Sequence, residues 1–139
     1  MDSKMFCFQC EQTAGCSACT GGAGVCGKTS VVANLQDELS GALIELVKAG
    51  AKPSKEMDHL ILEVLFTTVT NVNFNSETVQ ELISKVDRET AKLTGKAVEQ
   101  SVHYDMNKFW GDDEDIRSLK SLILFGIKGM AAYAYHAMV

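Results

Sequence analysis

The chain has 139 residues, a net charge of −5 at pH 7 and hydrophobic residues at 46% of its length, which is the balance of one compact globular domain. The acidic charge argues against nucleic acid and anionic membranes as partners. No apolar run is long enough to span a bilayer, and the first residues carry no apolar export signal, so we expect a cytoplasmic protein with no membrane partner.

Every cysteine of the chain lies in residues 1–28, which are also rich in glycine. This segment shows neither the period of a helix nor that of a strand, so we expect a loop folded around a bound group. Clustered cysteines in a reducing compartment serve as metal ligands or redox groups, and an odd number argues against a closed disulfide framework. The cysteines are Cys7, Cys10, Cys16, Cys19 and Cys26.

The first predicted helix runs from Thr29 or Ser30 to Ala49. Thr29 or Ser30 is suited to cap its start, and Gly50 is suited to end it. Apolar residues recur at the spacing of one helical face, and we expect them to be buried: Val32, Leu35, Leu39, Leu43, Leu46 and Val47.

Two further helices are predicted in the middle of the chain. One begins after Pro53–Ser54 and ends near residues 71–73, and the other runs from Asn75 or Ser76 to just before Gly95, followed by a mixed loop over residues 95–111. The helix after Pro53–Ser54 is expected to bury Leu60, Ile61, Val64, Leu65, Thr68 and Val69. The helix that ends before Gly95 is expected to bury Val79, Leu82, Ile83, Val86 and Leu93.

The fourth predicted helix starts in the acidic run 112–115, where the helix dipole favours negative charge, and continues to the end of the chain. Its apolar residues cover a wide arc, and we expect it to pack back on the bundle or to form a homo-oligomer. Residues 35–43 align with residues 119–127 as a faint internal repeat, although two amphipathic helices always align in some register. In this alignment residues 112–139 open a second helical bundle.

The cysteine spacing leaves three kinds of site open. Cys7-x2-Cys10 and Cys16-x2-Cys19 are chelating pairs, and Cys26 follows them. A structural zinc site uses two such pairs, but the spacer between these is short and the fifth cysteine has no role. An iron–sulfur cluster takes four thiolates, and the glycines of the loop let backbone amides approach its sulfides. Free or redox-active thiols are the third alternative.

A family resemblance begins in the cysteine loop. FCFQCEQTAGCSACTGGAGVCGK at 6–28 is similar to the N-terminal motif of the hybrid cluster proteins, also called prismane proteins or hydroxylamine reductases. Three later segments resemble the same family in the same order: ANLQDEL at 33–39, LFTTVTNVNF at 65–74 and DEDIRSLKSLILFGIKGMAAYAYHA at 113–137. The resemblance covers almost the whole chain.

The resemblance implies a cysteine-ligated cluster in this loop. By position, Cys7 and Cys10 match the first two ligands of the family, Cys19 matches the third and Cys26 the last. Their C-x2-C-x8-C-x6-C spacing is near the family's [4Fe-4S] form, whereas members with a longer second spacer carry [2Fe-2S]. Cys16 is the alternative third ligand.

The resemblance also implies what this chain lacks. The family's catalytic centre is an iron–sulfur–oxygen cluster bound by histidine, glutamate and cysteine ligands from further domains. This chain has no cysteine after Cys26, and His59, His103 and His136 lie outside those motifs. We therefore expect the N-terminal helical domain alone, without a catalytic residue. Lys28 is either a counter-charge for the cluster or an ordinary first-turn lysine.

We expect an all-α fold with a cysteine-rich iron–sulfur loop (1–28), a three-helix antiparallel bundle (29–111) and a long fourth helix (112–139). The primary hypothesis is an electron-relay domain of a hydroxylamine or nitric oxide reductase. Its [4Fe-4S] cluster would serve the remainder of the enzyme or an electron-donor protein. The alternative is a non-catalytic structural or interaction module whose loop binds zinc or no metal.

Overall fold

The computed structural model describes residues 5–10, 18–69, 72–109 and 111–138. Its α-helices are α1 (Ser30–Lys48), α2 (Lys55–Thr67), α3 (Ser76–Thr94) and α4 (Glu114–Met138), and two short 3-10 turns, η2 (Val98–Gln100) and η3 (Met106–Phe109), lie between α3 and α4. The described residues form no strand, only one isolated bridge between Ala23 and Thr29. The predicted all-α fold with a long fourth helix is confirmed.

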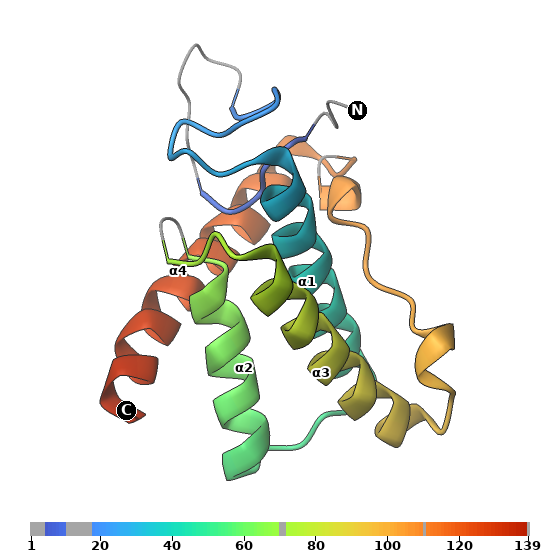
Figure 1. Ribbon diagram of the computed structural model, residues 1–139. Coiled ribbons are helices and arrows are strands. Elements are labelled where there is room, and N and C mark those ends of the chain that lie inside the picture. The colour runs from blue at the N-terminus through green and yellow to red at the C-terminus, as the bar shows by residue number, and fades with distance from the viewer. Residues whose placement is uncertain (1–4, 11–17, 70–71, 110, 139) are drawn as a thin grey trace.

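Helices α1, α2 and α3 alternate in direction beneath the cysteine loop, and α4 crosses obliquely beside α2 (Figure 1). The most extensive packing joins α1 to α3 and α2 to α4. Buried side chains of all four helices meet in one core, which orients the N-terminal end of α1 toward the cysteines. The buried members of this core are Leu39, Ala42, Leu43, Leu46, Val64, Leu65, Val79, Leu82, Ile83, Val86 and Ala131.

Polar caps set the helix starts at the predicted places. The side chains of Thr29, Ser54 and Asn75 each accept a hydrogen bond from a backbone N–H two or three residues further along. Such caps satisfy donors that the first helical turn leaves without partners. Gly95 ends α3 in the left-handed conformation, with a φ of 69°.

The predicted end of α2 near residues 71–73 is wrong, because the helix ends at Thr67. Residues 70–71 lie outside the described residues. The buried side chain of Gln36 in α1 donates from its Nε2 to the carbonyl of Thr67 (3.2 Å) and to that of Asn73 (2.8 Å). A carbonyl of the last turn thus bonds to a neighbouring helix instead of to the next turn of its own.

Two residues of the predicted apolar stripes are exposed instead of buried. Val47 in the last turn of α1 is 56% exposed, and Leu93 in the last turn of α3 is 43% exposed. The residues that follow these helices are themselves exposed at 52–54 and 95–100, so in the described part of the chain they do not bury these two side chains. Each buried stripe therefore ends before its helix does.

The connection between α3 and α4 returns along the bundle and is fixed at two points. The N–H of Tyr104 donates to the carbonyl of Gly41 (3.3 Å), and a Cβ at Gly41 would lie 2.2 Å from the Tyr104 carbonyl oxygen. His103 lies between Glu38 of α1 (3.1 Å) and Asp87 of α3 (2.8 Å). This histidine lies in the predicted loop over residues 95–111 and bridges two helices from there.

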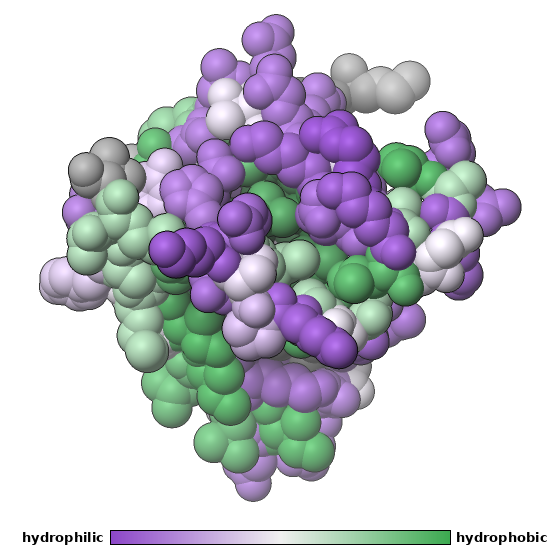
Figure 2. All heavy atoms as spheres, turned by 90° about the horizontal axis from the view of Figure 1, so that it is seen from below, coloured by the Kyte–Doolittle hydropathy of each residue, from purple (hydrophilic) through white to green (hydrophobic). Residues whose placement is uncertain are grey.

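Most of the apolar surface of α4 faces solvent. Its buried side chains are Lys128 and Ala131, and Tyr135 stacks on Phe66 of α2 with 4.8 Å between ring centroids. The helix therefore packs back on the bundle along one narrow face. Figure 2 shows apolar side chains open to solvent on the face viewed from below. Among the described helices, none is long and apolar enough to cross a bilayer. The exposed large apolar residues of α4 are Ile116, Leu119, Leu122, Ile123, Phe125, Ile127, Met130, Tyr133 and Met138.

Candidate metal centre

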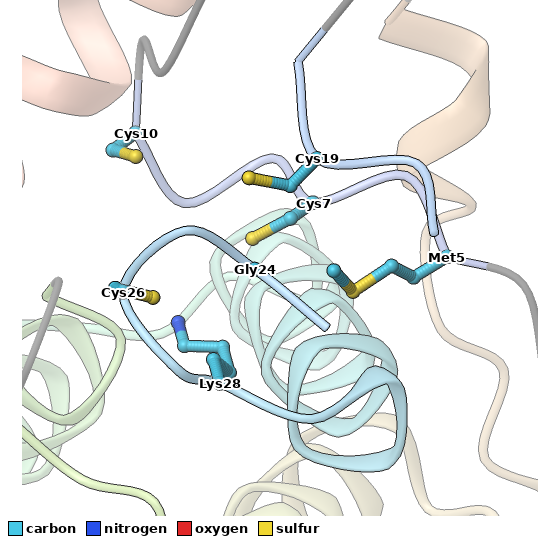
Figure 3. Close-up of a pocket in the computed structure, with 7 residues that line it drawn as sticks. All are labelled: Met5, Cys7, Cys10, Cys19, Gly24, Cys26 and Lys28. Atoms are coloured by element: carbon cyan, nitrogen blue, oxygen red, sulfur yellow. The ribbon is translucent and has the colours of Figure 1, made fainter. Parts of the chain in front are cut away.

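Cys7, Cys10, Cys19 and Cys26 line one cavity of about 50 Å³. Cys7 and Cys10 belong to the segment 5–10, and Cys19 and Cys26 belong to the loop that leads into α1. Figure 3 shows all four sulfurs directed toward the same space. The structure thus brings together the four cysteines that the sequence singled out. The remaining lining residues are Met5, Gly24 and Lys28.

Backbone hydrogen bonds hold the cysteine segments against each other. The N–H of Cys7 donates to the carbonyl of Cys19 (3.1 Å). The N–H of Gly24 donates to the carbonyl of Lys28 (2.7 Å), and that of Gly27 donates to the carbonyl of Gly24 (2.9 Å), which closes a tight loop around the last cysteine. Gly27 has a φ of 87°, a conformation that glycine adopts without steric cost.

Gly24 leaves room between two of the sulfurs. A Cβ at this position would lie 3.4 Å from Sγ of Cys26 and 3.8 Å from Sγ of Cys19. A larger side chain would enter the space on which the thiols converge. A glycine here therefore suits a bound group that occupies the centre of the cavity.

The four thiols are free, and their protonation depends on their surroundings. Burial raises the pKa of the Cys7 thiol, and the backbone hydrogen bond at Gln9 and the nearby charge of Lys28 act in the opposite direction. The protonated thiol is therefore favoured at Cys7 in the metal-free chain. Because the thiolate is the form that binds metal, binding at this site releases protons.

Four thiols around one cavity are a donor set for an iron–sulfur cluster or for a thiolate-bound metal ion. Among the described residues, no three Cys, His, Asp or Glu side chains are already arranged around a single metal ion, so the thiols have to move closer together to bind one. A tetrahedral zinc site, with Zn–S bonds of about 2.3 Å, needs its sulfurs within about 4 Å of one another. In a [4Fe-4S] cluster each cysteine binds a different iron, so the sulfurs lie further apart. The cavity of about 50 Å³ exceeds the roughly 10–15 Å³ that one water needs.

Comparison with known proteins agrees with the cysteine motif. The family model described as the Prismane/CO dehydrogenase family matches residues 5–139. The chain belongs to this family. The predicted family is thereby confirmed.

Similar members of the Prismane/CO dehydrogenase family are named hydroxylamine reductases. The one from Clostridium novyi (strain NT) is 37% identical over 96% of this chain. That from Maridesulfovibrio salexigens is 40% identical over 97%, and that from Methanocella arvoryzae is 38% identical over 97%. The chain covers 30%, 30% and 31% of these relatives, so it spans about a third of their length.

Two buried lysines of this family member approach the cysteines. Lys28, which lines the cavity, donates from its Nζ to the side-chain oxygen of Gln36. Lys128, from the middle of α4, donates from its Nζ to the side-chain oxygen of Gln9, the residue before Cys10. Exposed fractions of 2% and 3% show that both ammonium groups are removed from water. Lys28 is thus not an ordinary exposed first-turn lysine.

A carboxyl group completes the network on the far side of Gln9. The Nε2 of Gln9 and the backbone N–H of Phe8 (3.4 Å) both donate to Oδ1 of Asp37 in α1. Burial raises the pKa of Asp37 to about 7, against these hydrogen bonds. Burial likewise lowers the pKa of Lys128 to about 8. Both groups therefore change charge close to neutral pH.

Sequence reasoning missed Lys128, Gln9 and Asp37. Lysine and aspartate on amphipathic helices are ordinarily solvent-facing, and nothing local marks these as buried. One signal was available, because Lys128 interrupts the apolar arc of its helix.

Cys16 lies outside the described residues, so its role as the alternative third ligand stays a prediction. His59 and His136 are exposed and are absent from the cavity lining.

Proposed function

We propose that Cys7, Cys10, Cys19 and Cys26 hold a [4Fe-4S] cluster that relays electrons one at a time within a hydroxylamine reductase-like protein. The convergence of four free thiols on one cavity, in a member of this family, is the observation that carries the proposal. Such a cluster, when bound, supplies one-electron transfer. The residues of this chain bind it, surround it with apolar groups and limit its contact with water.

The reaction of the relatives suggests what such a relay serves. Reduction of hydroxylamine to ammonia and water consumes two electrons and two protons, so a one-electron carrier has to pass electrons twice for each substrate molecule. No cysteine follows Cys26, and we propose that the substrate-reducing centre belongs to the rest of the larger protein. Free thiols of this kind persist in a reducing compartment such as the cytoplasm.

The first experiment is metal analysis of anaerobically purified chain. We expect about four irons and four sulfides per chain, visible charge-transfer absorbance, and an EPR signal after reduction with dithionite. About two irons and two sulfides would replace the [4Fe-4S] assignment by [2Fe-2S]. One zinc per chain, or no metal after anaerobic reconstitution with iron and sulfide, would overturn the relay in favour of a structural module.

Single substitutions assign the ligands. Cys7→Ser, Cys10→Ser, Cys19→Ser and Cys26→Ser should each lower the iron content and change or abolish the EPR signal. Cys16→Ser should leave both unchanged, and it serves as the matched thiol control. If Cys16→Ser lowers the iron content and Cys19→Ser does not, then Cys16 is the third ligand in place of Cys19. The assignment of the other three ligands would stand.

A further inference from the structure

The two buried lysines of the cysteine site come from opposite ends of the chain. Lys28 lies two residues after Cys26 and forms part of the cavity wall, with its ammonium directed toward the sulfurs in Figure 3. Lys128 reaches the same site from α4 through Gln9. A local loop and a distant helix therefore each contribute one buried ammonium group.

Neither ammonium group has a carboxylate within ion-pair distance among the described residues. The hydrogen-bond acceptors of Lys28 and Lys128 are the neutral side-chain oxygens of Gln36 and Gln9. Burial of a charge is costly unless an opposite charge accompanies it. Burial lowers the pKa of Lys128 in the metal-free chain, and the charge of Lys28 acts in the same direction, so the attraction of Asp37 offsets this cost only in part.

A centre bound by four thiolates supplies the missing negative charge. An oxidised [4Fe-4S] cluster with four cysteine thiolates carries two negative charges, and so does a single divalent ion with four thiolates, whereas reduction of the cluster adds one more. Two ammonium groups match the two charges of the bound centre. Among the residues that the structure describes, the carboxyl group in this network is that of Asp37, whose pKa burial raises to about 7.

We infer that Lys28 and Lys128 are the counter-charges of the metal centre and act as positioning residues that favour the loaded and the reduced site. This inference rests on the proposed function only in requiring that the four cysteines bind a metal. Through Lys128 it extends to α4: a loaded centre stabilises the buried position of this lysine, and the buried lysine stabilises the centre in return.

The test compares Lys28→Met and Lys128→Met with Lys120→Met. Methionine keeps the length of the side chain and removes the charge. Lys120 is the matched control because it also lies on α4, but its side chain is 41% exposed. The readout is the dissociation constant of Co²⁺, whose thiolate absorbance reports binding without any iron chemistry. We expect about a tenfold or larger increase for each buried lysine and less than about a twofold change for the control.

A second measurement separates a charge role from a structural one. If the lysines act as counter-charges, Lys128→Met should leave the thermal midpoint of the metal-free chain no lower than Lys120→Met does, while Co²⁺ binding still weakens. Equal Co²⁺ affinities in all variants, or equal losses of metal-free and metal-loaded stability, would overturn the inference. Gln9→Glu keeps the size of the side chain at position 9 and pairs Lys128 with a carboxylate, so it should also weaken Co²⁺ binding. This variant tests the inference if a methionine variant does not fold.

The iron-loaded chain distinguishes this inference from the proposed function. There, both methionine variants should shift the reduction potential to more negative values, because a reduced centre loses the attraction of a nearby cation, and the control should not shift it. Lysine-dependent Co²⁺ binding in a chain that assembles no iron–sulfur cluster would retain the counter-charges and reject the electron relay. A cluster that assembles with the same reduction potential and metal affinity in both methionine variants would retain the electron relay and reject the counter-charges.

Discussion

The ammonium group of Lys128 donates a hydrogen bond to the side-chain oxygen of Gln9 across 119 positions of the sequence. Gln9 in turn donates to Asp37 of α1. One buried network thus joins α4, the cysteine segment and the first helix. Its two ends carry groups of opposite charge, and burial moves the pKa of each toward neutrality. The stability of the metal-free chain should therefore depend on pH in an unusual way.

We predict that the metal-free chain is least stable between about pH 7 and 8. The pKa of Asp37 rises from 3.8 to about 7 on folding, so between about pH 4 and 7 the folded chain binds more protons than the unfolded chain. Its stability therefore falls as pH rises through this range, by at most about 4 kcal/mol. The pKa of Lys128 falls from 10.5 to about 8, so stability recovers as pH rises further. Denaturant unfolding from pH 4 to 10 under reducing conditions measures this profile.

Asp37→Asn provides the decisive comparison for the pH profile. The variant lacks the titrating carboxyl, so the fall in stability between pH 4 and 7 should largely disappear. Asp58→Asn, at an exposed position in α2, is the control and should keep the fall. Identical slopes in wild type and Asp37→Asn would contradict the assignment.

The parts of this fold that were predictable from sequence are local. Caps at Thr29, Ser54 and Asn75 act within three residues, and the cysteines that line the cavity lie close together in one segment whose motif resembles that of a known family. The errors arise from contacts between distant segments. The end of α2 depends on Gln36 of another helix, and the burial of Lys128 depends on a partner 119 positions away. The division at residues 28 and 111 stays a prediction.

Gly24→Ala should impair metal loading without destabilising the fold. The new methyl group would lie 3.4 Å from the Cys26 sulfur and 3.8 Å from the Cys19 sulfur, within the space that a bound centre occupies. We expect a lower iron content after reconstitution and an unchanged thermal midpoint of the metal-free chain. Gly21→Ala is the control because nothing lies within 4 Å of its Cβ position. Full loading of Gly24→Ala would show that the centre lies elsewhere.

Gly41→Ala should destabilise the chain strongly. Its Cβ would lie 2.2 Å from the carbonyl oxygen of Tyr104, so the 95–111 connection has to move off α1, at a cost of about 1–3 kcal/mol. Gly126→Ala in α4 meets nothing within 4 Å and should stabilise the chain by about 0.5–1 kcal/mol. Urea unfolding of both variants checks the pair. A neutral Gly41→Ala would mean that the loop is not fixed at this point.

The exposed face of α4 should cause the chain to self-associate. Leu119, Leu122 and Ile123 are 60%, 68% and 60% exposed, and a cluster of large apolar side chains on one helix is a recurrent feature of association surfaces. Burying each of these side chains contributes about 1.5–3 kcal/mol. We therefore predict a homo-oligomer through α4, to be measured by size-exclusion chromatography with light scattering over a range of concentrations.

Leu119→Glu combined with Ile123→Glu should convert this oligomer to a monomer. Both positions lie one helical turn apart on the same face, and two carboxylates there would oppose the burial of that face against a second copy. Val47→Glu is the control, because Val47 is comparably exposed at 56% but lies on α1, and it should leave the oligomer intact. A wild-type chain that stays monomeric at all concentrations would reject association through α4, and dissociation by Val47→Glu as well would place the interface elsewhere.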